Sequence, residues 1–236
     1  KRQAVWLVNR PEWLALMLGL SRIGAVLVAV NTRYRAAELQ HILSMSGARI
    51  LIMQPSFRKI DFQSLLQDLQ PHALPDLETI AVIDPETQLP NLNWCSGMAF
   101  PDLASTDATE LEDKSGDNDL AILFATSGTT KMPKLVMHTQ CSLAHHAQCV
   151  AAAFLFDQPG AGLLAPLPFC GTFGLVPVIA ALAAGARITV MEAFDAKPAV
   201  ELIRTHQLTH LFGSDEMYWR LLDAVPESVR PVSYTH

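Results

Sequence analysis

The chain has 236 residues, of which half are hydrophobic and only 17% are charged, so it can bury a sizeable core. This balance is inconsistent with a disordered chain, and the formal net charge of -6 gives no electrostatic basis for nucleic-acid binding. The four cysteines are widely spaced and include no CxxC pair. We therefore expect free thiols in a reducing cytoplasm rather than a zinc site or a disulfide framework.

The first third of the chain alternates between strand-like and helix-like segments. Residues 4–8 form a continuous apolar run, typical of a strand that is covered on both faces. Pro11 then begins a helix that we expect to continue to about Gly24, and Gly47 is expected to end the next helix. The same alternation predicts strands at 26–30, 49–53 and 79–83, and helices at 36–46 and 62–69.

The segment 84–119 differs, because prolines and small polar residues interrupt it, and we interpret it as mostly connecting loop. Beyond it the alternation predicts strands at 120–124, 162–167, 187–191 and 208–212, and helices at 138–154, 174–183, 196–206 and 215–225. Strands that alternate with helices predict an α/β fold with largely parallel sheets and helices on both faces.

The expected domain organisation follows from these patterns. We predict a first α/β portion over 1–83, a loop-rich connection over 84–119 and a second α/β portion over 120–230 that holds a phosphate-binding loop. Residues 231–236 form a candidate non-native tail.

One stretch resembles a membrane span, because no charged side chain occurs between Asp157 and Arg187. Four prolines and several glycines interrupt it. A buried α/β core therefore explains this stretch better than a bilayer does, and we expect no transmembrane segment. His145 and His146 are adjacent, point in different directions on a helix, and are not expected to share a metal ion.

The stretch 123–134 carries the clearest chemical signal. An apolar strand runs into a loop that holds four hydroxyl side chains, one glycine and two lysines. Gly128 lets backbone N–H groups turn inward, the hydroxyls are neutral donors, and a lysine adds positive charge, so the loop suits an oligophosphate. The stretch lacks the G-x-x-x-x-G-K-[ST] pattern of the usual P-loop. From composition alone, an ordinary Ser/Thr-rich turn explains this stretch at least as well as a phosphate-binding loop does.

Several ordered motifs resemble the AMP-forming acyl- and aryl-CoA synthetase superfamily, to which luciferases and peptide-synthetase adenylation domains also belong. Residues 126–130 read T-S-G-T-T and precede Pro133-Lys134, as in the phosphate loop of that superfamily. Three further segments resemble family motifs and follow the family's order: S-R-I-G-A-V-L-V-A-V-N at 21–31, S-G-A-R-I-L-I at 46–52 and L-P-F-C-G-T-F-G-L at 167–175. The segments A-A-G-A at 183–186 and T-H-L-F-G at 209–213 also fall in order, so the resemblance spans nearly the whole chain.

The resemblance implies an enzyme that uses ATP, Mg²⁺ and coenzyme A to activate a carboxylic acid. The acid carboxylate attacks the α-phosphorus of ATP to give an acyl-adenylate and pyrophosphate, and coenzyme A then takes the acyl group. The residues that it assigns to the ATP β- and γ-phosphates are Thr126, Ser127, Gly128, Thr129, Thr130 and, as a supporting cation, Lys134. The residues that it assigns to the acid are Cys170, Gly171, Thr172 and Gly213.

Three departures from the family pattern alter these expectations. Lys131 and Leu135 replace two glycines of the loop, and a positive φ at either position would cost roughly 1 kcal/mol. Gly171 stands where the family often has a histidine, which favours a bulkier or longer acyl group, and Cys170 is expected to pack in the pocket wall. Ser214 is expected to cap the helix that follows Gly213.

Later family segments have no counterpart in this chain: the Y-G-x-T-E segment, the ribose-binding aspartate, the hinge and the terminal lysine. We expect further residues before Lys1 as well, and we expect this polypeptide alone not to catalyse the complete reaction. No catalytic residue is assigned. Two alternatives stay open: an adenylation domain that loads a carrier protein, and a non-catalytic nucleotide-binding homologue.

Overall fold

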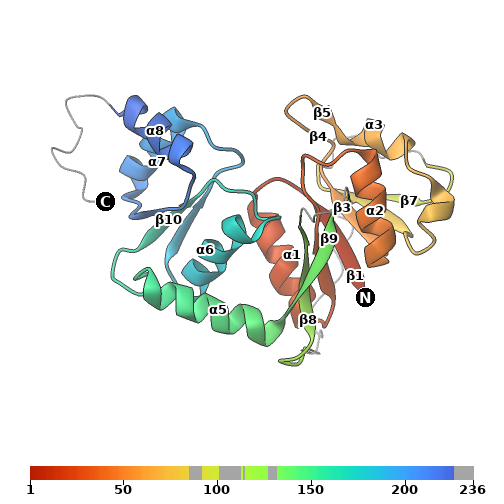
Figure 1. Cartoon of the computed structure of the whole chain (residues 1–236), viewed down its shortest axis with the longest axis horizontal. Helices are drawn as coiled ribbons and strands as arrows, with labels where there is room; N and C mark the ends of the chain where they lie inside the picture. Colours follow the sequence, from red (N-terminus) through yellow and green to blue (C-terminus); the bar gives the residue numbers. More distant parts are fainter. Residues whose placement is uncertain (85–91, 101–112, 114, 127–131, 226–236) are drawn as a thin grey trace. The chain divides into compact units, whose positions relative to one another are not determined.

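The computed structural model of the chain describes residues 1–84, 92–100, 113, 115–126 and 132–225. They form a mixed α/β fold with mostly parallel sheets, which confirms the fold class predicted from the alternating pattern (Figure 1). By its contacts the chain divides into two compact units, Lys1–Leu143 and Ala144–His236. The domain limits predicted from the sequence stay predictions.

The first unit contains a seven-stranded sheet with the strand order β7-β6-β3-β1-β2-β8-β9. Its strands are β1 (Arg2–Trp6), β2 (Val26–Ala29), β3 (Ile50–Met53), β6 (Thr79–Val82), β7 (Ser96–Ala99), β8 (Leu120–Thr126) and β9 (Lys134–Thr139). Neighbouring strands pair in parallel except β8 and β9, which pair antiparallel as the two arms of a hairpin. The short strands β4 (Ser56–Phe57) and β5 (Ile60–Asp61) form a separate antiparallel pair.

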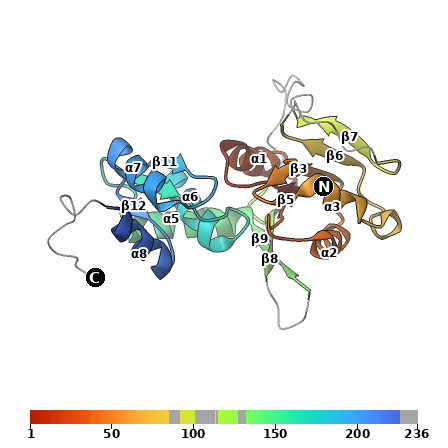
Figure 2. The same ribbon diagram turned by 90° about the horizontal axis from the view of Figure 1, so that it is seen from above.

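Three helices cover the two faces of this sheet. Helix α1 (Pro11–Arg22) lies on one face, and helices α2 (Ala36–Ser46) and α3 (Phe62–Gln67) lie on the other (Figures 1 and 2). Pro11 stands in the first turn of α1, where the N–H that proline lacks would have no helical partner. Gly47 ends α2 with a φ of 61°, a left-handed conformation that glycine adopts without steric cost. Both ends are as predicted.

The core of the first unit is centred on an aromatic stack. The rings of Trp6 and Phe62 lie 3.9 Å apart and nearly parallel, and neither side chain is accessible to solvent. The Trp6 indole Nε1 donates a hydrogen bond to the carbonyl oxygen of Asn31 at 3.1 Å, so its polar atom is satisfied. Because each buried ring contributes about 1.5–3 kcal/mol, this stack holds α3 firmly on the sheet.

The second unit is a smaller α/β layer around a three-stranded parallel sheet with the order β11-β10-β12. Its elements are α5 (Gln140–Ala153), β10 (Gly162–Ala165), α6 (Thr172–Ala183), β11 (Arg187–Val190), α7 (Ala196–His206), β12 (His210–Leu211) and α8 (Asp215–Ala224). Helix α6 packs on β10 and β11, whereas α7 packs on β10 and α8 (Figure 1). Helix α5 begins in the first unit and continues into the second.

Besides the short β4–β5 pair, two strands of the large sheet were not predicted. Residues 96–99 lie in the segment interpreted as loop, yet they pair with β6 as β7. Residues 134–139 form β9, which ends two residues into the helix predicted at 138–154. The cause is a local exchange of hydrogen bonds, in which the Thr139 N–H donates to the Ser142 hydroxyl and the Ser142 N–H donates to the Thr139 hydroxyl. This reciprocal pair caps the helix and delays its start.

The charge-free stretch after Asp157 folds into a strand and a helix, as expected. Strand β10 is buried along its whole length, and helix α6 buries most of its residues despite the internal Pro177. Across the described part of the chain, no helix is both long enough and apolar enough to cross a bilayer.

Candidate functional site

The β8–β9 hairpin carries the predicted phosphate-binding loop between its two arms. The register pairs Phe124 with Val136, Ala125 with Leu135 and Thr126 with Lys134. Paired residues in antiparallel strands lie about 4.5–5.5 Å apart at Cα. The pairing therefore brings the two ends of the loop together. Residues 127–131, which include the predicted Ser127, Gly128, Thr129 and Thr130, lie outside the described residues.

Both ends of the loop are open to a ligand. Thr126 and Lys134 are exposed at the last paired position of the hairpin. Among the described residues Lys134 makes no ion pair, so its ammonium group is available to an anion. A hydroxyl and an ammonium group at adjacent positions supply two kinds of hydrogen-bond donor to phosphate oxygens.

His41 on α2 anchors the hairpin just before Lys134. Its Nε2 lies 3.0 Å from the carbonyl oxygen of Pro133, which is itself buried. A backbone carbonyl can only accept, so this imidazole nitrogen is the donor. Sequence analysis did not identify His41, because 92 positions separate the partners and nothing in the local pattern marks the histidine.

Leu135 is accommodated where the family pattern has a glycine. It lies within β9, opposite Ala125, and it is not among the described non-glycine residues with a positive φ. The strain considered for this position is therefore absent, because a strand conformation suits any side chain. Lys131, the other departure in the loop, lies outside the described residues.

Three of the residues assigned to the acid stand at the start of α6. Cys170 is buried with 7% exposure, Gly171 is the N-cap residue with extended backbone, and Thr172 begins the helix and is exposed. The burial of Cys170 shows that it packs inside the fold, and its place in the wall of an acid pocket stays a prediction. Gly213, the fourth, follows β12 beside Met217, whose Sδ would lie 3.3 Å from a side-chain carbon added there.

A pocket of about 360 Å³ opens between α5, the first turns of α6 and the end of β12. The side chains that line it are His146, Val150, Phe154, Thr172, Phe173, Val176, Pro177 and Phe212. Of the predicted acid-binding residues, Thr172 lines this pocket, and Gly213 directly follows the lining residue Phe212. Six of the eight side chains are apolar, and the volume lies within the range of small-molecule sites.

Polar contacts hold the β12 side of this pocket in place. The His210 imidazole lies 2.7 Å from both the Thr209 hydroxyl and the carbonyl oxygen of Phe154, and so links β12 to the end of α5. The Tyr218 hydroxyl donates to the Leu211 carbonyl oxygen at 2.7 Å, and burial raises the pKa of Tyr218. Tyr218 is therefore neutral at physiological pH. Ser214 occupies the N-cap of α8, but its side chain makes no capping hydrogen bond.

Metal-ligand groups are not gathered in the described part of the chain. Among those residues, no three His, Cys, Asp or Glu side chains lie together in a way that could hold a metal ion. All four cysteines are free thiols.

Comparisons with known proteins bear on what this arrangement does. Residues 1–233 match the family described as AMP-binding enzyme. YngI of Bacillus subtilis (strain 168), whose assigned name is that of an acyl-CoA synthetase, is 32% identical over 231 residues. That match covers 91% of this chain but only 42% of YngI, so the chain spans less than half the length of this relative.

Solved structures show the same fold. The inhibitor-bound N-terminal domain of FACL13 from Mycobacterium tuberculosis is similar with a TM-score of 0.76 and 26% identity, covering 98% of this chain and 53% of that one. The anthranilate CoA ligase AuaEII in complex with anthranoyl-AMP has a TM-score of 0.76 and 25% identity, covering 92% of this chain and 40% of that one. With the matched family covering nearly all of its residues, this chain belongs to the AMP-binding enzyme family.

Proposed function

We propose that this chain is part of an ATP-dependent carboxylic acid:CoA ligase. The enzyme joins a carboxylic acid to AMP with release of pyrophosphate, and then transfers the acyl group to the thiol of coenzyme A. The observation that carries the proposal is the family match over residues 1–233, together with two relatives named as an acyl-CoA synthetase and a CoA ligase.

The hairpin loop is the proposed ATP phosphate site. Thr126 and Lys134 hold the β- and γ-phosphates at the two ends of the loop, and Ser127, Gly128, Thr129 and Thr130 complete the site. The adjacency of Thr126 and Lys134 in the β8–β9 register supports this assignment. The role of Lys134 is to neutralise charge on the departing pyrophosphate, because the reaction places negative charge on those oxygens.

Mg²⁺ fits this site as an ion that is bound to the phosphates of ATP, and not as an ion that these residues hold. Its chemistry is to neutralise the triphosphate, and it prefers to keep several waters and bind through phosphate oxygens and one or two carboxylates. No ligand cluster of three is found in the described part of the chain. The proposal therefore assigns no described residue as a magnesium ligand.

The pocket in the second unit is the proposed acid site. Thr172 and the first turns of α6 line it, and Gly171 and Gly213 are the chain neighbours of the lining residues Thr172 and Phe212, with Cys170 next to Gly171. Its mostly apolar wall suits the hydrocarbon part of an acid, because each Å² of apolar surface that is removed from water contributes about 25 cal/mol to binding.

The free thiols support a reducing cytoplasm as the compartment of the enzyme.

The phosphate assignment is tested by titrating the 236-residue chain with MgATP by isothermal calorimetry. We expect the Lys134→Ala chain to bind MgATP about tenfold or more weakly, because a hydrogen bond to a charged group contributes about 1.5–3 kcal/mol. Lys59→Ala is the matched control, since Lys59 is an exposed lysine in the turn between β4 and β5. Equal affinity of the wild-type and Lys134→Ala chains would refute the role of Lys134.

A further inference from the structure

The pocket proposed for the acid adjoins a second, much smaller hollow. The pocket holds about 360 Å³, whereas the hollow holds about 10 Å³. The hollow has room for about one water molecule, and so cannot accept a carbon chain in this conformation. Three side chains line both spaces, namely those of Phe173, Pro177 and Phe212. They therefore form a partition between the two.

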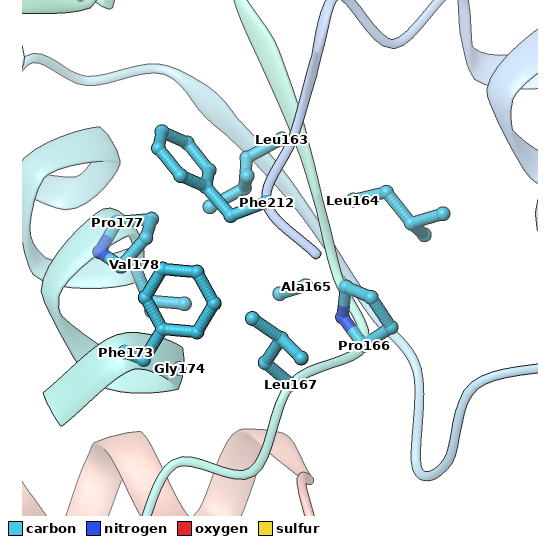
Figure 3. A pocket seen from close by; sticks show the side chains of 10 residues that line it. All are labelled: Leu163, Leu164, Ala165, Pro166, Leu167, Phe173, Gly174, Pro177, Val178 and Phe212. Carbon is cyan, nitrogen blue, oxygen red and sulfur yellow. The ribbon is translucent and has the colours of Figure 1, made fainter. Parts of the chain in front are cut away.

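The far side of the partition is apolar. Figure 3 shows the shared side chains around the same hollow as residues from β10 and the loop after it. The residues that line only the hollow are Leu163, Leu164, Ala165, Pro166, Leu167, Gly174 and Val178. A space that opened here would be hydrophobic and suited to a hydrocarbon chain.

Two of the three partition side chains are held in place. The Phe212 ring packs edge-on against Phe154 with centroids 5.0 Å apart, and also stacks near Phe156 at 6.2 Å. Pro177 is buried, and its ring is part of the α6 backbone. Neither can move without disturbing the fold around it.

Phe173 differs from both. Its side chain is 62% exposed, and within the described residues it makes no ring contact. An exposed side chain changes rotamer in picoseconds to nanoseconds, because little packing opposes the change.

The backbone beneath Phe173 is fixed by the next residue. A side-chain carbon added at Gly174 would lie 2.2 Å from the carbonyl oxygen of Pro168 and 2.7 Å from that of Leu167. The first turn of α6 thus presses directly on the loop that follows β10. The Phe173 ring can therefore rotate while the backbone of the helix stays packed on this loop.

We propose that Phe173 sets the length of acid that the enzyme accepts. Its ring is the movable part of the wall that the pocket shares with the hollow, and the occupant is the unbranched carbon chain of an alkanoic acid. Removing the ring joins the pocket to the hollow behind it. This inference rests on the proposed function, because it takes the pocket to be the acid site.

The test is a chain-length profile of the complete enzyme that contains this chain. We expect Phe173→Ala to raise kcat/KM for dodecanoate relative to octanoate by about tenfold or more, mostly through KM, since one methylene in an apolar pocket changes selectivity by at least that factor. Phe173→Trp is expected to shift the profile towards butanoate. Leu182→Ala is the control, as Leu182 is 40% exposed on the same helix and lines neither space.

An unchanged chain-length profile in Phe173→Ala would overturn the inference, provided that circular dichroism shows the variant folded. Phe173→Leu serves as the milder variant, with a smaller shift in the same direction. If the wild-type enzyme activates no carboxylic acid, alkanoic or aromatic, the proposed function fails. In that case, binding of dansyl-undecanoic acid to the 236-residue chain reports on the pocket alone. Tighter binding by Phe173→Ala supports the partition, and equal binding overturns it.

Discussion

Gly174 occupies a position where the backbone of α6 meets the loop after β10. The Cβ of any other residue would lie 2.2 Å from the Pro168 carbonyl oxygen, far inside van der Waals contact. We predict that Gly174→Ala lowers the free energy of unfolding by about 1–3 kcal/mol, because overpacking forces the backbone apart. Urea unfolding of the 236-residue chain measures this change.

Gly171 provides the matched control for that substitution. It lies three residues earlier, and an added Cβ there would meet its nearest atom, the Pro168 carbonyl oxygen, at an ordinary 3.8 Å. Its φ of -122° also suits any residue. Gly171→Ala should therefore unfold within about 0.5 kcal/mol of the wild-type chain. Equal stability of the two variants would contradict the close approach at Gly174.

Cys95 is predicted to be an unreactive thiol at neutral pH. Burial raises the pKa of Cys95 to about 11, an effect only partly opposed by its hydrogen bond to the Ser96 backbone. The thiolate is the reactive form, so alkylation of Cys95 should be slow near pH 8 and rise as the pH approaches 11. Iodoacetamide labelling followed by peptide mass spectrometry measures this profile. Rapid labelling of Cys95 near neutral pH would contradict it.

At the residue scale, sequence reasoning identified types of side chain better than their partners. Thr126 and Lys134 stood out because hydroxyl and ammonium groups gathered beside a glycine, and the strand register brings these two together. His41 did not stand out, because its contact with Pro133 depends on the tertiary fold. The sequence suggested backbone strain at Leu135, but this residue lies in a strand and has no positive φ.

The β8–β9 hairpin is the element on which the proposed phosphate site depends. His41 fixes the second arm through the Pro133 carbonyl oxygen, one residue before Lys134. We predict that His41→Ala weakens MgATP binding by roughly fivefold, because a typical intramolecular hydrogen bond contributes about 1 kcal/mol. Calorimetric titration of the 236-residue chain gives this value.

His72→Ala is the control for that prediction, because His72 is an exposed histidine in the short 3₁₀ helix Pro71–Ala73. It should leave MgATP affinity unchanged. If the His41→Ala chain bound MgATP as tightly as the wild type, the anchor would have no part in shaping the loop.

At the element scale, long apolar runs were predictable and short or returning strands were not. Strands such as β1 and β10 are buried on both faces, so their apolar sequences are unambiguous. Strand β7 has the sequence Ser-Gly-Met-Ala, which has little strand propensity, and it forms only through its pairing with β6. The start of α5 depends on the Thr139–Ser142 exchange, which apolar periodicity does not reveal.

For the whole molecule, the alternating pattern was enough to predict the α/β class and its mostly parallel sheets. The pocket in the second unit was not predictable in the same way. Its lining comes from α5, α6 and the end of β12, which are separated in sequence and meet only in the folded unit. The motifs at 167–175 and 209–213 indicated two of its walls, whereas Val150 and Phe154 on the third carry no local signal.

The enzyme that contains this chain is proposed to activate a carboxylic acid on ATP. The most direct measurement is acid-dependent exchange of labelled pyrophosphate into ATP by the complete enzyme, across a panel of alkanoic and aromatic acids. We predict exchange that requires one class of acid and that falls by about tenfold or more in Lys134→Ala. Binding of ATP without exchange for any acid in the panel would contradict the claim.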